Sequence, residues 1–390
     1  MKELKVLITN HSLRERTGTE MYAFELARGL LASGHSPVLY SPRPGALAEL
    51  IRMETVPVVS DLDKLGSTPD IIHGQHSDET VTALLRFPRT PALYVCHDWY
   101  DSIDTPPRFP RILRYVAVDS QCRDKLVFEH GVAEERVSVL LQFVDLEKFR
   151  ARREPLPAKP RRALILCNLT RENEYLKAAR AACTRAGVSL DVYGLRVGRP
   201  HARPEELMAG YDIVFAKGRT ALEASAVGAF VIIYWWRRLG AAVTLDALER
   251  LRTDNFGTRA MGPQLTPEEF GRDIEASLAR YDSAEAARVS ERVRAEAGRE
   301  RFVKEFVGLY ESVIAEHAAR PSRDEEAEAR AAASYLRSVS LSKAKEYDAL
   351  HDSATFRVRE RLLRMPLVGG LARALTRAAA GTRRATRNES

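Results

Sequence analysis

Short apolar segments of strand length alternate with longer amphipathic segments through the first 320 residues. In the segment after the first strand, for example, Ala23, Leu26 and Leu30 recur at helical spacing, and Gly34 closes the helix. This alternation of strand and helix predicts parallel sheets covered by helices, the doubly wound α/β class. The expected strands are residues 5–9, 36–41, 71–73, 92–96, 115–119, 137–141, 163–167, 189–193, 213–215 and 230–234.

A basic, proline-rich segment interrupts this alternation near the middle of the chain. Residues 150–162 contain Pro155, Pro157 and Pro160 and are typical of a linker. We therefore expect an α/β chain with two Rossmann-like doubly wound domains that face each other across a cleft. A helical extension and a basic tail follow. The expected parts are residues 1–155, 156–318, 319–354 and 355–390.

The positive charge of the chain is concentrated at its C-terminal end. The formal net charge is +7, and residues 355–390 contain nine arginines and two glutamates, so the preceding residues are formally neutral. This distribution argues against nucleic acid as a partner. Within the tail, Val368 and Leu375 share one helical face. Arg373 and Arg377 share another, which favours a segment resting on an anionic membrane surface. A flexible end and a docking arm for a partner are the alternatives.

The cysteines and the apolar runs indicate the compartment. The chain has no Cys-x2-Cys pair among Cys96, Cys122, Cys167 and Cys183. We therefore expect buried thiols in a reducing cytoplasm rather than a zinc ribbon or a disulfide framework. The N-terminus reads as a strand and lacks the long apolar region of a signal peptide. The longest apolar run, residues 224–236, is shorter than the roughly 20 residues that span a bilayer. We expect a cytoplasmic protein that at most rests on the inner face of the cell membrane.

The first expected strand leads into a glycine-containing loop and then into a helix. Gly18 would let the backbone approach a ligand closely. Gly18 and Thr19 lie where the helix begins, so their amide groups could bind an anion such as a phosphate. The alternative is an ordinary helix start, with Thr17 or Thr19 as the N-cap.

Three histidines follow expected strands of the first domain. His97 lies at the carboxyl end of a strand, where a doubly wound sheet binds ligands. An imidazole there can hydrogen-bond a sugar or exchange a proton near neutral pH. His73 and His76 follow another strand, but no carboxylate or cysteine has matching ligand spacing. We therefore expect no metal site and interpret these two histidines as structural hydrogen-bonding groups.

The most informative stretch lies in the expected second domain. There a strand leads directly into a short turn and a helix of small residues, and the turn reads Lys217, Gly218, Arg219, Thr220. With Thr220 as the N-cap, the next amides would be free for a phosphate, beside the charges of Lys217 and Arg219. Glu223 would then lie in the first helical turn. Its carboxylate could accept hydrogen bonds from ribose hydroxyls, or simply stabilise the helix.

Four segments together resemble the GT-B glycosyltransferases of the GT4 type, the retaining group that uses nucleotide sugars. Residues 115–149 resemble the family segment ending Asn-Gly-Val-Asp…Phe, and residues 222–231 resemble the block Leu-Glu-Ala…Gly-x-Pro-Val. With the alternation, the resemblance covers about residues 3–318. It implies a GT-B fold with an acceptor-side first domain and a nucleotide-sugar-binding second domain. The four segments are the loop Gly18-Thr19-Glu20, the strand ending at His97, residues 115–149, and Leu222-Glu223-Ala224 with Gly228 and Val231.

The resemblance implies roles for individual residues. His97 would be the catalytic-site residue that hydrogen-bonds the transferred sugar, and Glu223 would bind ribose as the second glutamate of the Glu-x7-Glu signature. The amides after Gly218 and around the first-strand loop would bind the diphosphate. Asn168 and Arg171 follow the first strand of the second domain and would also contact the donor. Arg171 matches the family's arginine there, whereas the family's lysine is absent.

The sequence departs from the family pattern at three places. The first signature glutamate, which normally contacts the sugar, is replaced by Phe215. The Asn-Gly pair is replaced by Gln142 and Phe143, and the proline after Gly228 is Ala229. The chain therefore resembles a divergent branch of the family.

The expected activity is transfer of a sugar from a UDP- or GDP-sugar to a glycan, lipid-linked or other acceptor, as in polysaccharide or glycoconjugate synthesis. Retention of configuration is expected, without metal or a further cofactor. Arg171, Lys217 and Arg219 would stabilise the departing diphosphate, because preorganised electrostatics is usually the largest catalytic contribution. Two alternatives stay open: a sugar-nucleotide epimerase on the same fold, and a non-catalytic nucleotide-sugar-binding scaffold, which Phe215 suggests.

Overall fold

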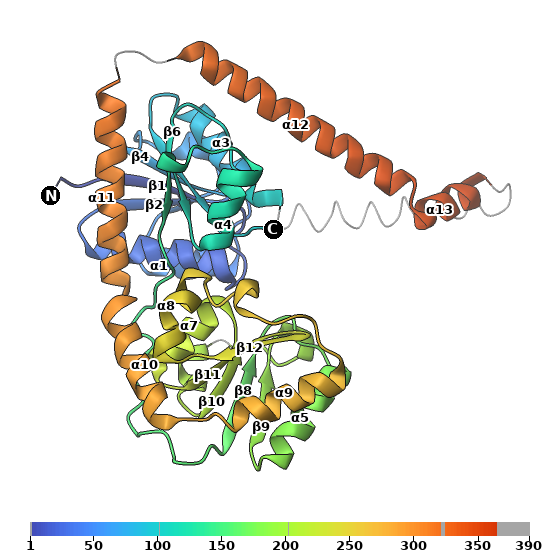
Figure 1. Ribbon diagram of the computed structural model, residues 1–390. Coiled ribbons are helices and arrows are strands. Elements are labelled where there is room, and N and C mark those ends of the chain that lie inside the picture. Colours follow the sequence, from blue (N-terminus) through green and yellow to red (C-terminus); the bar gives the residue numbers. More distant parts are fainter. Residues whose placement is uncertain (1, 101, 202, 321–323, 365–390) are drawn as a thin grey trace. The chain divides into compact units, whose positions relative to one another are not determined.

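The computed structural model describes residues 2–100, 102–201, 203–320 and 324–364. The chain forms two compact units, residues 1–323 and 324–390. The first unit contains two separate, mainly parallel sheets with helices around them (Figure 1). This arrangement confirms the expected α/β class.

The first sheet is parallel throughout and has the strand order β3-β2-β1-β4-β5-β6-β7. Its central strands β4 and β5 are buried along their whole length, because helices cover both faces of a doubly wound sheet. The strands are β1 (Lys5–Thr9), β2 (Ser36–Tyr40), β3 (Val58–Val59), β4 (Ile71–Gln75), β5 (Ala92–Cys96), β6 (Ile112–Ala117) and β7 (Val137–Val139). Its helices are α1 (Gly18–Ala32), α2 (Ala46–Met53), α3 (Ser77–Arg86) and α4 (Ser120–Asp124), which a π-helical turn (Lys125–Glu129) extends.

The second sheet has the order β12-β11-β10-β8-β9, and only its edge strand β12 is antiparallel. Two apolar cores lie on its two faces: Val214 and Ala216 of β10 belong to one, and Ile213 and Phe215 to the other. The strands are β8 (Arg162–Leu166), β9 (Ser189–Tyr193), β10 (Ile213–Ala216), β11 (Phe230–Trp235) and β12 (Arg238–Ala242). The helices are α5 (Glu174–Arg185), α6 (Pro204–Met208), α7 (Gly218–Val227), α8 (Leu245–Thr253), α9 (Pro267–Leu278) and α10 (Ser283–Glu296).

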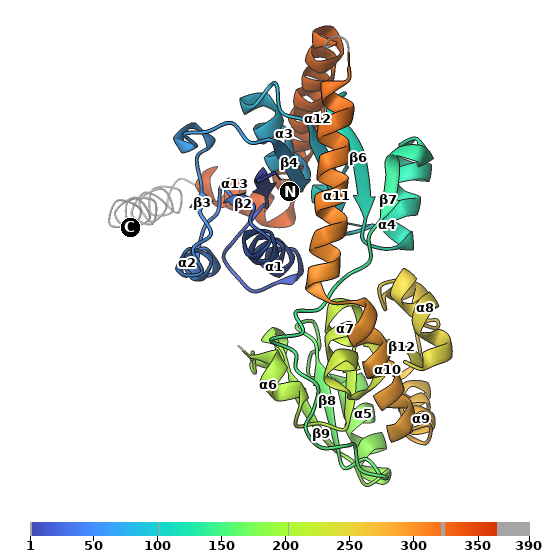
Figure 2. The ribbon, with the colours of Figure 1, turned by 90° about the vertical axis from the view of Figure 1, so that its left-hand side faces the viewer.

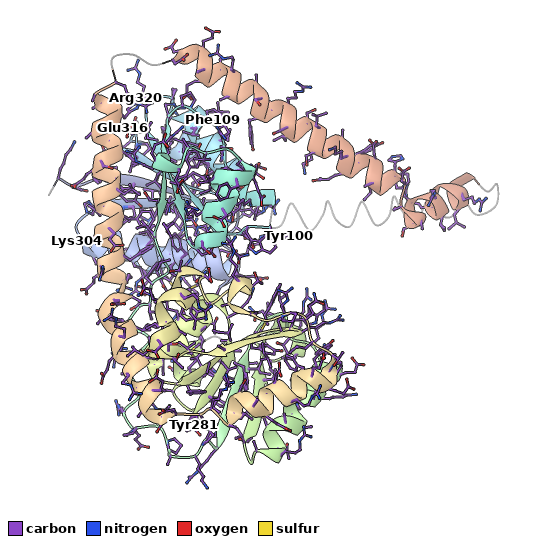
Figure 3. All side chains as sticks on the ribbon, in the orientation of Figure 1. Tyr100, Phe109, Tyr281, Lys304, Glu316 and Arg320 are labelled. Atoms are coloured by element: carbon purple, nitrogen blue, oxygen red, sulfur yellow. The ribbon has the colours of Figure 1, made fainter. Side chains whose placement is uncertain are left out.

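Helix α11 (Arg299–Ala318) returns the chain from the second sheet to the first (Figures 1 and 2). Gly29 allows α1 and α11 to approach closely, because a Cβ atom there would lie 2.4 Å from Val303 Cγ2. Near its end lies Glu316 (Figure 3), which pairs with Arg114 of β6 at 2.7 Å. The predicted second domain, residues 156–318, includes this helix, although its buried side chains pack on the first sheet.

All ten expected strands are present. The strands at 5–9, 92–96 and 189–193 have the expected bounds, and the others are shifted by one to three residues. The largest shift is at β6, which was expected at 115–119, begins at Ile112 and ends at Ala117. The chain leaves the sheet there because the Asp119 side chain caps α4 by accepting the N–H of Cys122 at 2.7 Å. Two strands had no clear signal in the sequence. β3 has only two residues, and β12 contains Gly240, which weakens a strand pattern.

The second unit consists of α12 (Glu325–His351) and α13 (Ala354–Arg364) in its described part. The Asp324 side chain caps α12 by accepting the N–H of Ala327 at 2.8 Å. Together with α13, this confirms the helical region that the sequence predicts after the second domain. Among the described residues, no helix is long and apolar enough to cross a membrane. Residues 365–390, most of the expected basic tail with its amphipathic face, lie outside the described part.

Candidate functional site

The predicted site residues follow the carboxyl ends of parallel strands in both sheets. His97 follows β5, Lys217 follows β10, and Asn168 follows β8. Because ligands bind at this edge of doubly wound sheets, it is the natural place for a site. The chemistry then depends on what each strand-to-helix turn holds.

The turn between β10 and α7 consists of Lys217 alone. Lys217 is the N-cap and α7 begins at Gly218, so the expectation that Thr220 caps the helix was wrong. Gly218 has φ +57°, a left-handed conformation that glycine adopts without strain. Its N–H donates to the carbonyl of Phe256 at 3.1 Å. The earlier helix start also moves Glu223 from the first turn to the second, away from the strongest part of the helix dipole.

Arg219 joins the two halves of the first unit. Its Nη2 donates to Glu25 on α1, and its Nε donates to Glu223 on the next turn of α7 at 2.8 Å. The guanidinium also lies 5.2 Å from the ring centroid of Phe143. Both carboxylates are buried, and burial raises the pKa of Glu223 while the charge of Arg219 lowers it. In this arrangement Arg219, predicted to bind phosphate, pairs with two carboxylates, although its buried Nη1 bonds to none of the described residues.

Lys217 lies in a partly apolar site at the same turn. Its Nζ stands 4.1 Å from the ring centroid of Trp235 at the end of β11. Burial lowers the pKa of Lys217, whereas the nearby Cys167 and Asp98 raise it. Asp98 follows His97 in the other half of the unit. Because Arg219, two residues after Lys217, also bonds to Glu25 of that half, the turn after β10 lies close to the first sheet.

The turn between β1 and α1 is longer and is held by side chains. Thr17 is the N-cap by position, as one expected alternative states, but its hydroxyl donates to Glu20 rather than capping an amide. Thr19 also donates to Glu20, at 3.3 Å, and its carbonyl accepts from Asn10 Nδ2 at 3.1 Å. A Cβ atom at Gly18 would meet nothing within 4 Å, which leaves open space in front of the helix start.

His97 is held by its backbone and by an aromatic neighbour. Its N–H donates to Asp104 Oδ2 at 3.2 Å, and its ring lies edge-on to Tyr22 with the centroids 4.6 Å apart. Burial, His76 and His73 all lower the pKa of His97, so the imidazole is neutral at pH 7. Its buried Nε2 has no hydrogen-bond partner among the described residues. A neutral ring nitrogen of this kind can bind a hydroxyl group.

The carboxyl group beneath His97 is unusual. Asp104 is buried, and burial raises its pKa to about 7, opposed by the charge of Lys125. Its second oxygen, Oδ1, has no hydrogen-bond partner in the described part of the chain. Asp104 is thus half protonated near neutral pH while it fixes the backbone of His97.

The other two histidines have structural contacts, in line with their expected role. His73 Nδ1 lies 2.7 Å from the hydroxyl of Tyr310 on α11, and burial lowers the pKa of His73 to about 3. His76 has φ +60° and its Nδ1 accepts the N–H of His11 at 3.0 Å. No group of three or more metal-ligating side chains is present in residues 2–100, 102–201, 203–320 and 324–364.

Two predicted donor residues are not joined to this cluster. Asn168 Oδ1 accepts the N–H of Leu195 at 3.3 Å and so orders the loop after β9. Arg171 is exposed, with no ion pair to a described residue. Phe215 is fully buried in the core beside Tyr234, so β10 offers no place for the missing signature carboxylate.

Sequence reasoning missed three residues of the site: Glu25, Tyr22 and Asp104. Glu25 and Tyr22 lie within an ordinary amphipathic helix, and only the fold brings them to Arg219 and His97. A possible signal was the presence of two acids, Glu20 and Glu25, on the otherwise apolar face of α1.

Comparison with known proteins agrees with this architecture. Residues 16–148 match the model of Glycosyltransferase Family 4. Among solved structures, the chain is similar to a glycosyltransferase from Rickettsia africae ESF-5, with a TM-score of 0.59 and 13% identity over 80% of this chain and 99% of that chain. It is also similar to a putative UDP-N-acetylglucosamine 2-epimerase from Listeria monocytogenes, with a TM-score of 0.45 and 13% identity over 83% of this chain and 99% of that chain. The curated proteins gave no significant sequence match.

The fold is therefore the GT-B fold that the sequence resemblance implied, and the resemblance to the GT4-type glycosyltransferases is confirmed for residues 16–148. The low identity agrees with a divergent branch. At a general level, the family match supports a transferase.

Proposed function

We propose that this GT-B protein with a Glycosyltransferase Family 4 domain transfers a sugar from a nucleoside-diphosphate sugar to a glycan or lipid-linked acceptor. The carrying observation is that α1 links the start of α7 to the end of β5: Glu25 accepts from Arg219 of α7, and the Tyr22 ring lies 4.6 Å from the His97 ring. One edge offers a cation and helix amides for a diphosphate, and the other a neutral imidazole for a sugar hydroxyl.

The chemical steps follow from these groups. The diphosphate binds at the starts of α1 and α7, where Lys217 and the helix amides stabilise the charge that develops on the leaving oxygen. Glu223 accepts hydrogen bonds from the ribose, and His97 orients the transferred sugar through a hydroxyl. The acceptor hydroxyl attacks the anomeric carbon from the face that the diphosphate leaves and gives its proton to the departing diphosphate oxygen, which retains configuration. Our proposal includes no metal and no further cofactor.

Nucleotide binding tests this proposal directly. The purified full-length chain is titrated calorimetrically with UDP, GDP and ADP and with their sugar conjugates. We expect saturable binding of at least one nucleotide, and Glu223→Ala should weaken it by about tenfold or more. Glu174→Ala is the matched control, because Glu174 is an exposed acid at the start of α5 in the same half. Failure of every nucleotide and sugar conjugate to bind would refute the proposal.

The two alternatives give different turnover. A non-catalytic scaffold is suggested by Phe215, which leaves β10 without the signature carboxylate. It would bind a nucleotide sugar and release no diphosphate with any acceptor. An epimerase would change the donor sugar without an added acceptor, whereas a transferase needs the acceptor for sustained turnover.

We place the enzyme in the cytoplasm, at the inner face of the cell membrane, and assign the contact to residues 355–390. In α13, the exposed apolar side chains Val358 and Leu362 lie next to Arg357 and Arg361 in the sequence. Each basic residue near an anionic surface contributes about 1 kcal/mol. Full-length protein should co-sediment with phosphatidylserine vesicles more strongly than a chain ending at residue 354. Equal co-sedimentation would refute this assignment.

A further inference from the structure

Three neighbouring strands of the first sheet end in polar side chains on the same face. Strands β1, β4 and β5 are adjacent and parallel, and their register pairs Gln75 with Val95. Paired residues point to the same side of a sheet and side chains alternate along each strand, so Asn10, Gln75 and His97 share one face. Helix α1 covers this face, because Asn10 Nδ2 donates to the Thr19 carbonyl at 3.1 Å.

Tyr22 extends from α1 onto the same face. Its ring lies edge-on to the His97 ring, with the centroids 4.6 Å apart. The ring centroid of Phe143 lies 5.9 Å from that of Tyr22 and 5.2 Å from the Arg219 guanidinium. Tyr22 is therefore placed between the end of β5 and the start of α7, the elements to which our proposed function assigns the sugar and the diphosphate.

Three of these polar groups have no hydrogen-bond partner among the described residues. Gln75 is fully buried, with 0% of its surface exposed, and neither Nε2 nor Oε1 of its amide is paired. The buried hydroxyl of Tyr22 and the buried Nε2 of His97 are unpaired as well. A buried polar group without a partner destabilises the fold, and such groups are rare in native proteins. Three of them on one face indicate that another molecule completes their hydrogen bonds.

The backbone next to Gln75 is strained. His76 follows Gln75 directly and has φ +60°, in the left-handed region that residues other than glycine rarely adopt. Its Nδ1 accepts the N–H of His11 at 3.0 Å, which fixes the ring. Strained residues that are held by their surroundings are concentrated at ligand-binding sites. Strain and unpaired hydrogen-bonding groups thus occur together at the end of β4.

The chemistry of the three unpaired groups suits a neutral ligand that carries hydroxyls. An amide has donors and an acceptor, and a phenol hydroxyl both donates and accepts. Burial lowers the pKa of His97 well below its usual value, so its imidazole is uncharged at pH 7 and offers one donor and one acceptor. None of the three groups can neutralise an anion. Sugar hydroxyls, which both donate and accept, match all of them.

We propose that Gln75 and Tyr22 bind hydroxyl groups of the transferred sugar and determine which sugar the protein accepts. This assignment rests on the proposed function, in which His97 contacts the same sugar. An amide can bind one hydroxyl through its N–H and a neighbouring hydroxyl through its oxygen. A sugar with another configuration at either carbon leaves a buried amide atom unpaired, and a site of this kind discriminates strongly against such a sugar.

The test compares two affinities of the full-length chain by calorimetry, that for a nucleotide sugar and that for its bare nucleotide. Their ratio isolates the contribution of the sugar. For the UDP-, GDP- or ADP-sugar that the wild type binds best, Gln75→Leu and Tyr22→Phe should each lower this ratio about three- to tenfold. Tyr22→Phe keeps the ring that packs on His97, and Gln75→Leu keeps a side chain of similar size. Binding of the bare nucleotide shows that both variants are folded.

The free protein gives a second measurement. Each variant removes a buried polar group that has no partner, so without ligand both should unfold at a higher urea concentration than the wild type. Tyr94→Phe is the matched control for the sugar ratio. Tyr94 is buried and is paired with Gly74, so it points to the opposite face of the same sheet. Its variant should have the ratio of the wild type.

Two results overturn the assignment of Gln75 and Tyr22. The first is a ratio that neither variant lowers, or that Tyr94→Phe lowers as much. The second is an unchanged ratio together with lower stability, which would mean that the unpaired groups bind ordered water inside the fold. In either case binding of the nucleotide sugar itself leaves the proposed function standing.

A protein that binds no nucleotide and no nucleotide sugar refutes the proposed function. The methyl glycosides of glucose, galactose, mannose and N-acetylglucosamine, observed by saturation-transfer NMR, then test the sugar site by itself. Binding of at least one glycoside that Gln75→Leu and Tyr22→Phe weaken supports these residues as a sugar site. If no glycoside binds either, the assignment is refuted together with the proposed function.

Discussion

The two sheets end their central strands with opposite chemistry. After β5, burial keeps His97 neutral and raises the pKa of Asp104 to about 7. After β10 comes Lys217 and then Arg219, whose charge is paired with Glu25 and Glu223. One edge therefore offers the neutral imidazole of His97, which suits a sugar hydroxyl, and the other offers the charge of Lys217, which suits a diphosphate. A protein that transfers sugar from a charged carrier needs both.

The turns that follow β1 and β10 differ in length, and the two lengths suit different roles. The turn from β1 to α1 spans residues 10–17 and leaves open space at Gly18. The turn from β10 to α7 is one residue, and it requires the left-handed Gly218. The short turn directs Arg219 toward the other half, where Glu25 binds it. The long turn can admit a ligand, whereas the short turn fixes the contact between the halves.

The largest effect is expected from Arg219→Ala, which removes the contact between the two halves. It leaves Glu25 as an uncompensated buried charge, and removing one partner of a buried ion pair costs about 3–5 kcal/mol. Urea unfolding at pH 7 measures the loss. Arg171→Ala, at an exposed position in the same half, should change stability by less than about 0.5 kcal/mol. If the two variants unfold at the same urea concentration, the contact between the halves carries no stability.

The first sheet edge should respond to pH through Asp104. Burial raises its pKa from 3.8 to about 7, so between these values the folded state binds a proton that the unfolded state releases. The stabilising effect of this proton is complete below about pH 4 and lost as the pH rises to about 7. Asparagine does not titrate, so Asp104→Asn does not lose stability in this way as the pH rises. We therefore expect the stability of the variant relative to wild type to increase from pH 4 to 7, by a few kcal/mol, and then to stay level.

Unfolding curves at pH 5, 6, 7 and 8 measure this difference. Asp63→Asn, which changes an exposed carboxylate of the same half, is the matched control. If the difference in stability between Asp104→Asn and wild type does not change with pH, folding does not raise the pKa of the Asp104 carboxyl group.

Local signals in the sequence explain how much could be predicted. Parallel strands buried on both faces read as apolar runs, which is why all ten expected strands are present. The start of helix α9 can be recognised in the sequence, because Thr266 and Glu269 form a capping box around Pro267. The start of α7 was misplaced because Thr220 is a better N-cap by residue type than Lys217. Strand β10 ends at Ala216, directly before Lys217. Lys217 therefore takes the N-cap position, although threonine is the preferred residue type there.

Contacts between distant segments were beyond the sequence. Glu25 and Arg219 are separated by 194 positions, and nothing in the sequence identifies one as the partner of the other. The same holds for His73 and Tyr310, which α11 brings together from opposite ends of the first unit. The candidate site residues could be predicted because strand ends have a sequence pattern, whereas the residues that contact them from distant segments have none.

A smaller effect is expected from Gly218→Ala, which probes the short turn. A Cβ atom there would meet only the carbonyl of Asn255, at 3.9 Å, so there is room for it. The left-handed φ of +57° remains and costs an L-residue about 1–2 kcal/mol. Thermal unfolding should show this loss. If stability does not fall, the turn has adopted another conformation in which residue 218 is no longer left-handed.

The smallest change in stability is expected from Gly18→Ala in the long turn, and it sharpens the comparison most. No atom lies within 4 Å of the added methyl group, and alanine is a better helix former than glycine, so stability should stay the same or rise by up to about 1 kcal/mol. If a diphosphate approaches the start of α1, however, the methyl group occupies its path, and nucleotide affinity should fall several-fold. Calorimetric titration and thermal unfolding of this one variant then separate a ligand-binding glycine from a folding glycine. A variant that binds nucleotide like the wild type would restrict the diphosphate to the start of α7.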